Sequence, residues 1–196
     1  MFGKMKSQFN FQILIIIILC LTSCIQNPSK KEMGVVIQAS SQEQKLKEID
    51  KLVNKYPNSY ITYENKLQIL LSLKDIDNSI LNCLKMIEIE PTNAMIKVQL
   101  GMLYILKNDN EKADNQFTTA VFLYKKQLSE IKNNKNKKRL ISMELYIPLC
   151  LLNKNEEAAS LISDYIVNLS LSEKYLIEFL NSYNRLDIAN FCCLTE

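Results

Sequence analysis

Apolar residues recur at helical spacing from Gln42 onward, with polar residues at the positions between them. Three apolar stripes come first: Leu46, Ile49, Leu52, Val53 and Tyr56; then Tyr63, Leu67, Leu70 and Leu71; then Ile80, Cys83, Leu84, Ile87 and Ile89. The first stripe stops at Pro57 and the third at Pro91. Proline just past a helical run ends the helix, because it disfavours helical backbone in the residue before it. The two prolines are 34 residues apart, which predicts an all-α fold built from repeated helix pairs.

Further positions match at the same 34-residue interval, such as Cys83 with Phe117. The segment 94–124 resembles a tetratricopeptide (TPR) repeat at these signature positions: Leu100, Gly101, Tyr104, Asn108, Asp109, Ala113, Phe117 and Ala120. The small residues have a physical role, since Gly101 and Ala113 let the two helices of a pair approach closely and Ala120 admits the next helix. The preceding unit, 59–92, matches more loosely, because Leu67 stands where the family prefers a small residue.

A third unit fits if 11 extra residues are allowed. Its matching positions are then Leu145, Leu149, Asn153, Glu156, Glu157, Ala158 and Ile162. Pro148 lies inside the first helix of this unit, where its missing N–H predicts a kink. The extra residues coincide with the stretch 125–139, which carries seven basic residues and one acidic residue. We expect the helix that begins near Glu111 to run to about Ile131, followed by a polar connection over 133–138.

The chain beyond residue 168 is predicted to close the end of the array. Ser170 and Glu173 form a capping box, which opens a helix over 171–184. Repeat arrays expose their last apolar face, so a terminal cap is physically needed. The predicted fold is therefore all-α: antiparallel helix pairs stacked as a short TPR-like superhelix over 42–168, with capping helices over 169–196.

The first 24 residues follow the order basic, apolar, small, cysteine. Lys4 and Lys6 precede an unbroken apolar run over 13–21, which is the order of a secretory signal. The tetrapeptide Leu21-Thr22-Ser23-Cys24 resembles a bacterial lipobox. This resemblance implies a signal peptide over 1–23 and a diacylated Cys24 that anchors the mature protein to a bilayer. Two alternatives stay open: an uncleaved transmembrane helix, for which the run is short, and a secretory signal cut elsewhere.

Residues 24–41 are predicted to form a lipidated, irregular tether, because the segment 27–31 does not favour a helix. The expected location is the bacterial cell envelope. Ile25 follows the cysteine, where an Asp would resemble the inner-membrane retention signal of enterobacterial lipoproteins. The outer membrane is therefore favoured, with its periplasmic or surface face left open.

The amino-acid composition excludes several classes of catalytic and metal-binding site. The chain has no histidine, which excludes Ser-His-Asp and Cys-His nucleophile systems and His-ligated metal sites. Cys83 and Cys150 are predicted to be buried, whereas the adjacent Cys192 and Cys193 are either redox-active or structural. We expect no enzyme activity, no cofactor and no metal. Removing the two lysines of residues 1–23 from the formal net charge of +3 leaves +1, which gives no bulk attraction to nucleic acid.

In TPR arrays the first helix of each pair lines a concave groove that receives a peptide or a partner helix. By register, the groove residues here are Glu64, Gln68, Val98, Met102, Ile105, Met143, Ile147 and Cys150. The resemblance implies a membrane-anchored adaptor that binds an envelope protein or peptide in this groove, with the bilayer as a second partner through acylated Cys24.

Other interpretations remain open at this point. The groove could instead carry a lipid or other apolar ligand, or be filled internally by the helix over 171–184 or by the kinked third unit. A thiol enzyme would have to use Cys192 or Cys193. The basic stretch 125–139 either contacts anionic lipid or an acidic partner, or is a solvated connection.

Overall fold

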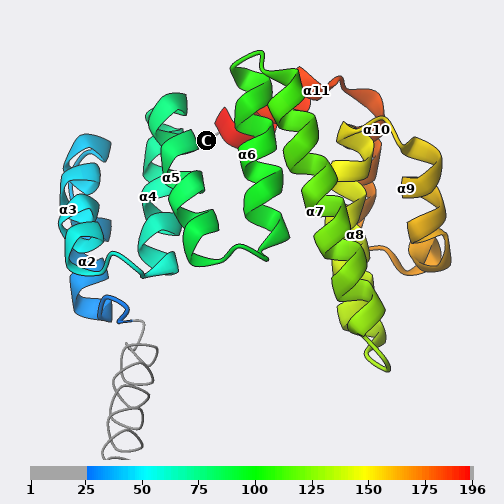
Figure 1. Ribbon diagram of the computed structural model, residues 1–196, viewed down its shortest axis with the longest axis horizontal. Helices are drawn as coiled ribbons and strands as arrows, with labels where there is room; N and C mark the ends of the chain where they lie inside the picture. Colours follow the sequence, from blue (N-terminus) through cyan, green and yellow to red (C-terminus); the bar gives the residue numbers. More distant parts are fainter. Residues whose placement is uncertain (1–25, 195–196) are drawn as a thin grey trace, which may run out of the picture.

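The computed structural model describes residues 26–194, and within that range the chain is all-α, as expected, with no strand. Its helices stand side by side in a row that curves from α2 to α9 (Figure 1). They are α2 (Lys30–Gln38), α3 (Gln42–Lys55), α4 (Tyr60–Ser72), α5 (Ile76–Ile89), α6 (Ala94–Leu106), α7 (Asn110–Glu130), α8 (Lys135–Leu151), α9 (Asn155–Ile162), the 3-10 helix η1 (Ser163–Asn168), α10 (Leu171–Ser182) and α11 (Arg185–Leu194). The predicted signal peptide and Cys24 lie outside the described residues.

Three helix pairs, α4–α5, α6–α7 and α8–α9, are joined by the same tight turn. In each turn one residue adopts the left-handed conformation: Lys74 (φ 57°), Asn108 (φ 63°) and Asn153 (φ 57°). The N–H of the next residue then donates to a carbonyl in the last turn of the first helix, at 2.9 Å in all three cases: Asp75 to Leu70, Asp109 to Tyr104 and Lys154 to Leu149. This geometry closes a helix C-terminus. The left-handed residues are spaced by 34 and then 45 positions, which is consistent with a helical repeat whose third unit carries 11 extra residues.

The turns that follow Pro57 and Pro91 also match each other. Tyr56 and Glu90 end the preceding helices with nearly the same backbone angles (φ −127° in both, ψ 64° and 76°). The next helix begins three residues after the proline in each case. In the second turn the side chain of Asn93 accepts from the Met95 and Ile96 N–H groups at the start of α6. The prolines therefore mark the junctions between helix pairs, as their spacing predicts.

The closest helix packing predicted from the sequence lies between α6 and α7. A Cβ atom placed on Gly101 would lie 2.4 Å from Cε1 of Phe117, well inside a carbon–carbon contact distance. Phe117, Ala113 and Ala120 are fully buried at this interface. The absence of a side chain at Gly101 therefore lets the Phe117 ring fill the space between the two helices.

The extra residues of the third unit lengthen α7 and separate it from α8. Helix α7 ends at Glu130, and α8 begins at Lys135 after Asn134, whose side chain accepts from the Lys137 N–H (2.9 Å). The end formed by the two helices projects beyond the rest of the row (Figure 1). Helix α8 continues through Pro148 to Leu151.

The expectation of an irregular tether over 24–41 is wrong for residues 30–38, which form α2. Ser29 and Glu32 make a capping box at its start. Its buried Val36 packs against α3 and α4 in a small core with Ile49, Leu52 and Ile69. The helix docks because this burial removes apolar surface from water.

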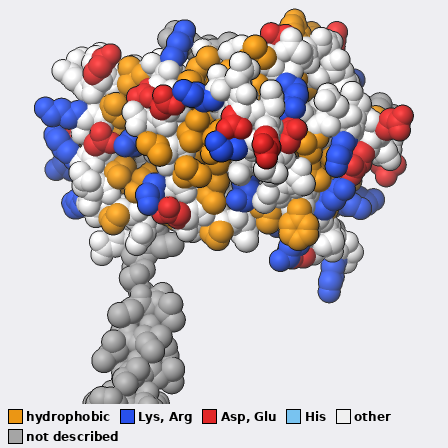
Figure 2. Space-filling model, turned by 45° about the horizontal axis from the view of Figure 1, so that its top comes forward, with side chains coloured by type: hydrophobic (Ala, Val, Ile, Leu, Met, Phe, Trp, Pro, Cys, Tyr) orange, Lys and Arg blue, Asp and Glu red, His pale blue; other side chains and the backbone are white. Residues whose placement is uncertain are grey.

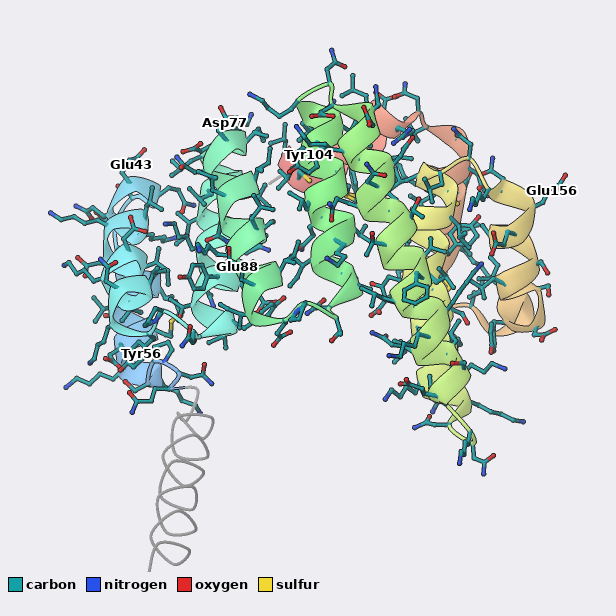
Figure 3. The ribbon with its side chains drawn as sticks, in the orientation of Figure 1. Glu43, Tyr56, Asp77, Glu88, Tyr104 and Glu156 are labelled. Atoms are coloured by element: carbon teal, nitrogen blue, oxygen red, sulfur yellow. The ribbon has the colours of Figure 1, made fainter. Side chains whose placement is uncertain are left out.

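Polar contacts also hold α2 on α3. The Glu32 carboxylate accepts from the Tyr56 hydroxyl (2.9 Å) and pairs with Lys55 (2.7 Å). Tyr56 lies at the end of α3 beside α2 (Figure 3). In addition, the Ser59 hydroxyl donates to the Asn27 side chain (2.7 Å). The chain is therefore fixed to the helical body from Asn27 onward.

Candidate binding site

The last helix of the chain covers the face where the groove was expected. Helix α11 packs against α6 and also contacts α4, which precedes it by more than a hundred residues (Figure 1). Its Ile188, Ala189 and Cys193 are buried in the same core as the apolar residues of α6. We call the side of α4, α6 and α8 that α11 and α10 cover the groove face, α11 lying on α4 and α6 and α10 on α8.

Most of the predicted groove residues are consequently not accessible. Val98, Met102, Ile105 and Met143 are 1, 5, 4 and 7% exposed, Cys150 is also buried, and Ile147 is half-buried. The apolar part of the predicted groove is therefore not open in the structure, in agreement with the alternative that the chain fills it internally. The physical reason is that these side chains are apolar and the chain supplies its own cover. The covering helix is α11, the one that follows the expected 171–184 helix, and α10 contributes Leu180 to the same core.

The two polar groove residues, Glu64 and Gln68, remain exposed. Glu64 lies in a cavity of about 710 Å³ between α4, the α5–α6 turn, α6, α7 and α8. We call it the acidic cavity, and its polar lining includes Tyr60, Glu64, Glu90, Tyr124, Gln127 and Glu144. Gln68 lies in a smaller cavity of about 240 Å³ between α2, α3 and α4.

The acidic cavity is electrostatically unbalanced. Its lining contains the three carboxylates Glu64, Glu90 and Glu144 and no lysine or arginine. Burial, with Glu64 and Glu90 close by, raises the pKa of Tyr60 to about 12. Burial also raises the pKa of Glu144, since a charged carboxylate is poorly solvated there. Tyr124 is buried and its pKa is raised, first by burial and then by Glu144.

A second cavity, of about 530 Å³, lies where α10 and α11 meet the helix-pair turns. Six asparagines line it: Asn108, Asn110, Asn153, Asn155, Asn181 and Asn184. Several of them have local structural roles. Asn108 and Asn153 take the left-handed conformation of the turns, which asparagine tolerates better than most residues, and Asn184 accepts from the Asp187 N–H (3.0 Å). Turn geometry therefore accounts for much of this cluster.

The cysteines of the described chain are free thiols, including the adjacent Cys192 and Cys193. Burial raises the pKa of Cys83 and of Cys193 to about 12 and also raises that of Cys150, while partial desolvation raises the pKa of Cys192, whose side chain is exposed. Thiol chemistry needs the thiolate, so these side chains are not poised as nucleophiles. Within residues 26–194 no group of three acidic or thiol side chains is arranged to hold a metal ion.

The basic stretch forms the projecting end of α7 and α8. Five of its lysines make no ion pair within residues 26–194: Lys126, Lys132, Lys135, Lys137 and Lys138. Lys125 and Arg139 pair with Glu157 and Glu173 and so tie this end to α9 and α10. Elsewhere on the face shown in Figure 2, acidic and basic side chains are interspersed around a band of hydrophobic ones. The projecting end is therefore locally cationic and solvated.

Comparison with protein families finds no family model that matches the chain, and comparison with curated proteins finds no match. Over residues 26–194, none of the helices has the length and hydropathy needed to span a bilayer. What the described chain defines is thus its class: an all-α protein of packed, repeated helix pairs, with its own C-terminal helix on the groove face.

Sequence reasoning missed the acidic cavity, apart from Glu64. Its three carboxylates lie at positions 64, 90 and 144, on separate elements, and only one falls at a predicted groove position. Tyr124 was assigned to the end of a repeat unit. The one signal that points to the cavity is Glu64, the single charged residue among the predicted groove positions.

Proposed function

We propose that this protein is a lipid-anchored, TPR-like adaptor of the bacterial cell envelope, which holds another protein near the membrane. The observation that carries the proposal is the repeated turn at Lys74, Asn108 and Asn153, joined to the close packing of Phe117 on Gly101. Stacked helix pairs of this kind present extended surfaces to other proteins rather than enclosed reaction sites.

The partner surface that we propose differs from the apolar groove predicted from the sequence. Helix α11 occupies that groove, so the partner contacts what α11 leaves open: Glu64, Gln68 and the two cavities in which they lie. Specificity then comes from polar and charged groups. A lipid carrier is not favoured, because Val98, Met102 and Ile105 are buried under the chain's own helices.

The docking of α2 bears on the proposed anchor. Because Asn27 already bonds to Ser59, only three peptide units separate Cys24 from the fixed body. Such a stretch spans about 10 Å at most. An acylated Cys24 would therefore hold the helical body against the membrane surface rather than far from it.

The adaptor proposal is tested by purifying the protein from envelope membranes after mild chemical cross-linking. We expect one discrete envelope protein to co-purify, and Glu64→Lys to release it. The matched control is Leu81→Lys on α5, since Leu81 is 60% exposed and lies outside both cavities. Loss of the partner in both variants, or no stoichiometric partner at all, would contradict the proposal.

The anchor is tested separately by Cys24→Ala. We expect the variant to stay unprocessed or to leave the membrane fraction, whereas the wild type carries acyl chains detectable by mass spectrometry. Normal processing and normal membrane attachment of Cys24→Ala would contradict lipidation.

A further inference from the structure

Three carboxylates share the acidic cavity without a cation. Glu64, Glu90 and Glu144 line it, and none of them forms an ion pair within residues 26–194. Glu90 accepts a hydrogen bond from the Asn93 amide (3.0 Å), which leaves the negative charges unneutralised. Several acidic residues elsewhere in the described chain do form ion pairs with lysines. One example is Asp109, whose carboxylate lies 2.6 Å from Nζ of Lys112. The cavity therefore carries uncompensated negative charge, which favours the binding of a cationic group.

A buried hydroxyl in the same cavity has no hydrogen bond of normal geometry within the described chain, and the group that interacts with it is Glu144. This hydroxyl belongs to Tyr124, which is 2% exposed. Buried polar groups in folded proteins nearly always have a partner, so one that does not calls for an explanation. Tyr124 lines the cavity beside Glu144, and its pKa is raised first by burial and then by that carboxylate. A carboxylate can only accept, so Glu144 leaves the lone pairs of the Tyr124 oxygen free for a hydrogen bond from a donor that enters the cavity.

The arrangement fits an organic cation. The carboxylates surround about 710 Å³ and are not grouped to hold a metal ion. This volume lies in the range of pockets that bind organic groups. A lysine ammonium offers three donors and an arginine guanidinium five, enough to reach separate carboxylates and the Tyr124 oxygen. We propose that the acidic cavity binds a lysine or arginine side chain of the protein partner, a step that rests on the proposed adaptor function.

The first test uses a defined probe, a tetralysine amide peptide, with its fully Nε-acetylated form as the control. The two peptides have the same backbone, and acetylation removes only the charge. We expect isothermal titration calorimetry to show that the purified full-length protein binds tetralysine and does not bind the acetylated peptide. Carbodiimide coupling, which joins an amine to a nearby carboxylate, should place the peptide on Glu64, Glu90 or Glu144 by mass spectrometry. Coupling spread evenly over surface carboxylates would overturn the proposal.

Two variants separate the cavity from general charge. Combining Glu64→Gln, Glu90→Gln and Glu144→Gln should weaken tetralysine binding by about tenfold or more, because each lost charge-assisted hydrogen bond is worth about that factor. The matched control combines Glu111→Gln, Glu156→Gln and Glu178→Gln, which changes net charge equally at exposed positions. Glu156, for instance, lies at the outer end of the row on α9 (Figure 3). Equal weakening in both variants would show bulk attraction and overturn the site.

Tyr124→Phe provides an independent test, since it removes only the hydroxyl. We expect weaker tetralysine binding without loss of the fold, which circular dichroism and thermal unfolding can check. Unchanged affinity would overturn the role of Tyr124. The proposed function is tested apart from this site: if the partner is still captured by the cavity variant, the adaptor stands and the cation site fails. If tetralysine binds the cavity but no partner exists, the cation site stands and the adaptor fails.

Discussion

The close approach of α6 and α7 predicts that Gly101→Ala destabilises the protein, although alanine favours helices. The added Cβ would lie 2.4 Å from Cε1 of Phe117 and 2.8 Å from Cδ1 and Cζ. Carbon atoms pack at about 3.5–4.0 Å, so the ring would have to retreat by about 1 Å. Phe117 is fully buried, as are Ala113 and Ala120 on the same helix. Overpacking of this kind costs about 1–3 kcal/mol.

Helix propensity acts in the opposite direction, because alanine in a helix interior is better than glycine by about 0.5–1 kcal/mol. We therefore expect a net loss of about 1–2 kcal/mol in the free energy of unfolding. Urea denaturation followed by circular dichroism measures this loss. In a double-mutant cycle, Phe117→Leu should relieve the clash, so that Gly101→Ala costs less in that background. An unchanged or higher stability of Gly101→Ala alone would refute the close packing of α6 on α7.

Three further predictions concern the turn, α2 and α11. Asn108→Ala should cost up to about 1–2 kcal/mol of stability in urea denaturation, because the left-handed conformation strains alanine more than asparagine, whereas Asn108→Gly should be tolerated. The pKa of Glu32 is lowered to about 2, chiefly by its hydrogen bond with Lys55. The ionised carboxylate therefore helps to hold α2 above pH 4.5, and this contribution is lost as the pH falls toward 2. Hydrogen exchange of α2 should rise over that range, and Glu32→Gln should remove this pH dependence. Ile188→Glu should release α11 and make an introduced Met102→Cys thiol reactive to maleimide, and continued protection of that thiol would contradict the covering role of α11.

The periodic part of the fold could be read from the sequence because its determinants are local. Helices α3 and α5 each end two residues before a proline, Pro57 and Pro91. Asn108 and Asn153 take the left-handed conformation at the same turn in two units. The capping box at Ser170 and Glu173 is formed as predicted. Each of these features depends on a few neighbouring residues, so pattern alone is enough.

Helix α2 was missed because its stability is not local. Its nine residues are few for an isolated helix, which is marginal in water below about 12–15 residues. The contacts that hold it come from Ile49, Leu52 and Ile69 on other helices. The capping box of Ser29 and Glu32 was a signal for a helix in the sequence. Pro28, which directly precedes it, instead favoured the prediction of an irregular segment.

The groove and the acidic cavity depend on tertiary contacts that the sequence does not specify directly. An apolar face such as that of Met102 and Ile105 must be covered, but periodicity does not say which segment covers it. The small Ala189, fully buried, lets α11 come close. The cavity, in turn, gathers Glu64, Glu90 and Glu144 from distant positions, and only the folded chain brings them together.

The most direct test of the account is photo-cross-linking in cells from two positions of the groove face. A photoreactive amino acid at Gln68, which is exposed, should capture a discrete envelope protein. The same group at Met102, which is 5% exposed, should react within the chain, with α11. Capture of the same partner from Met102 as efficiently as from Gln68 would contradict the account, since it would mean that α11 leaves the groove open.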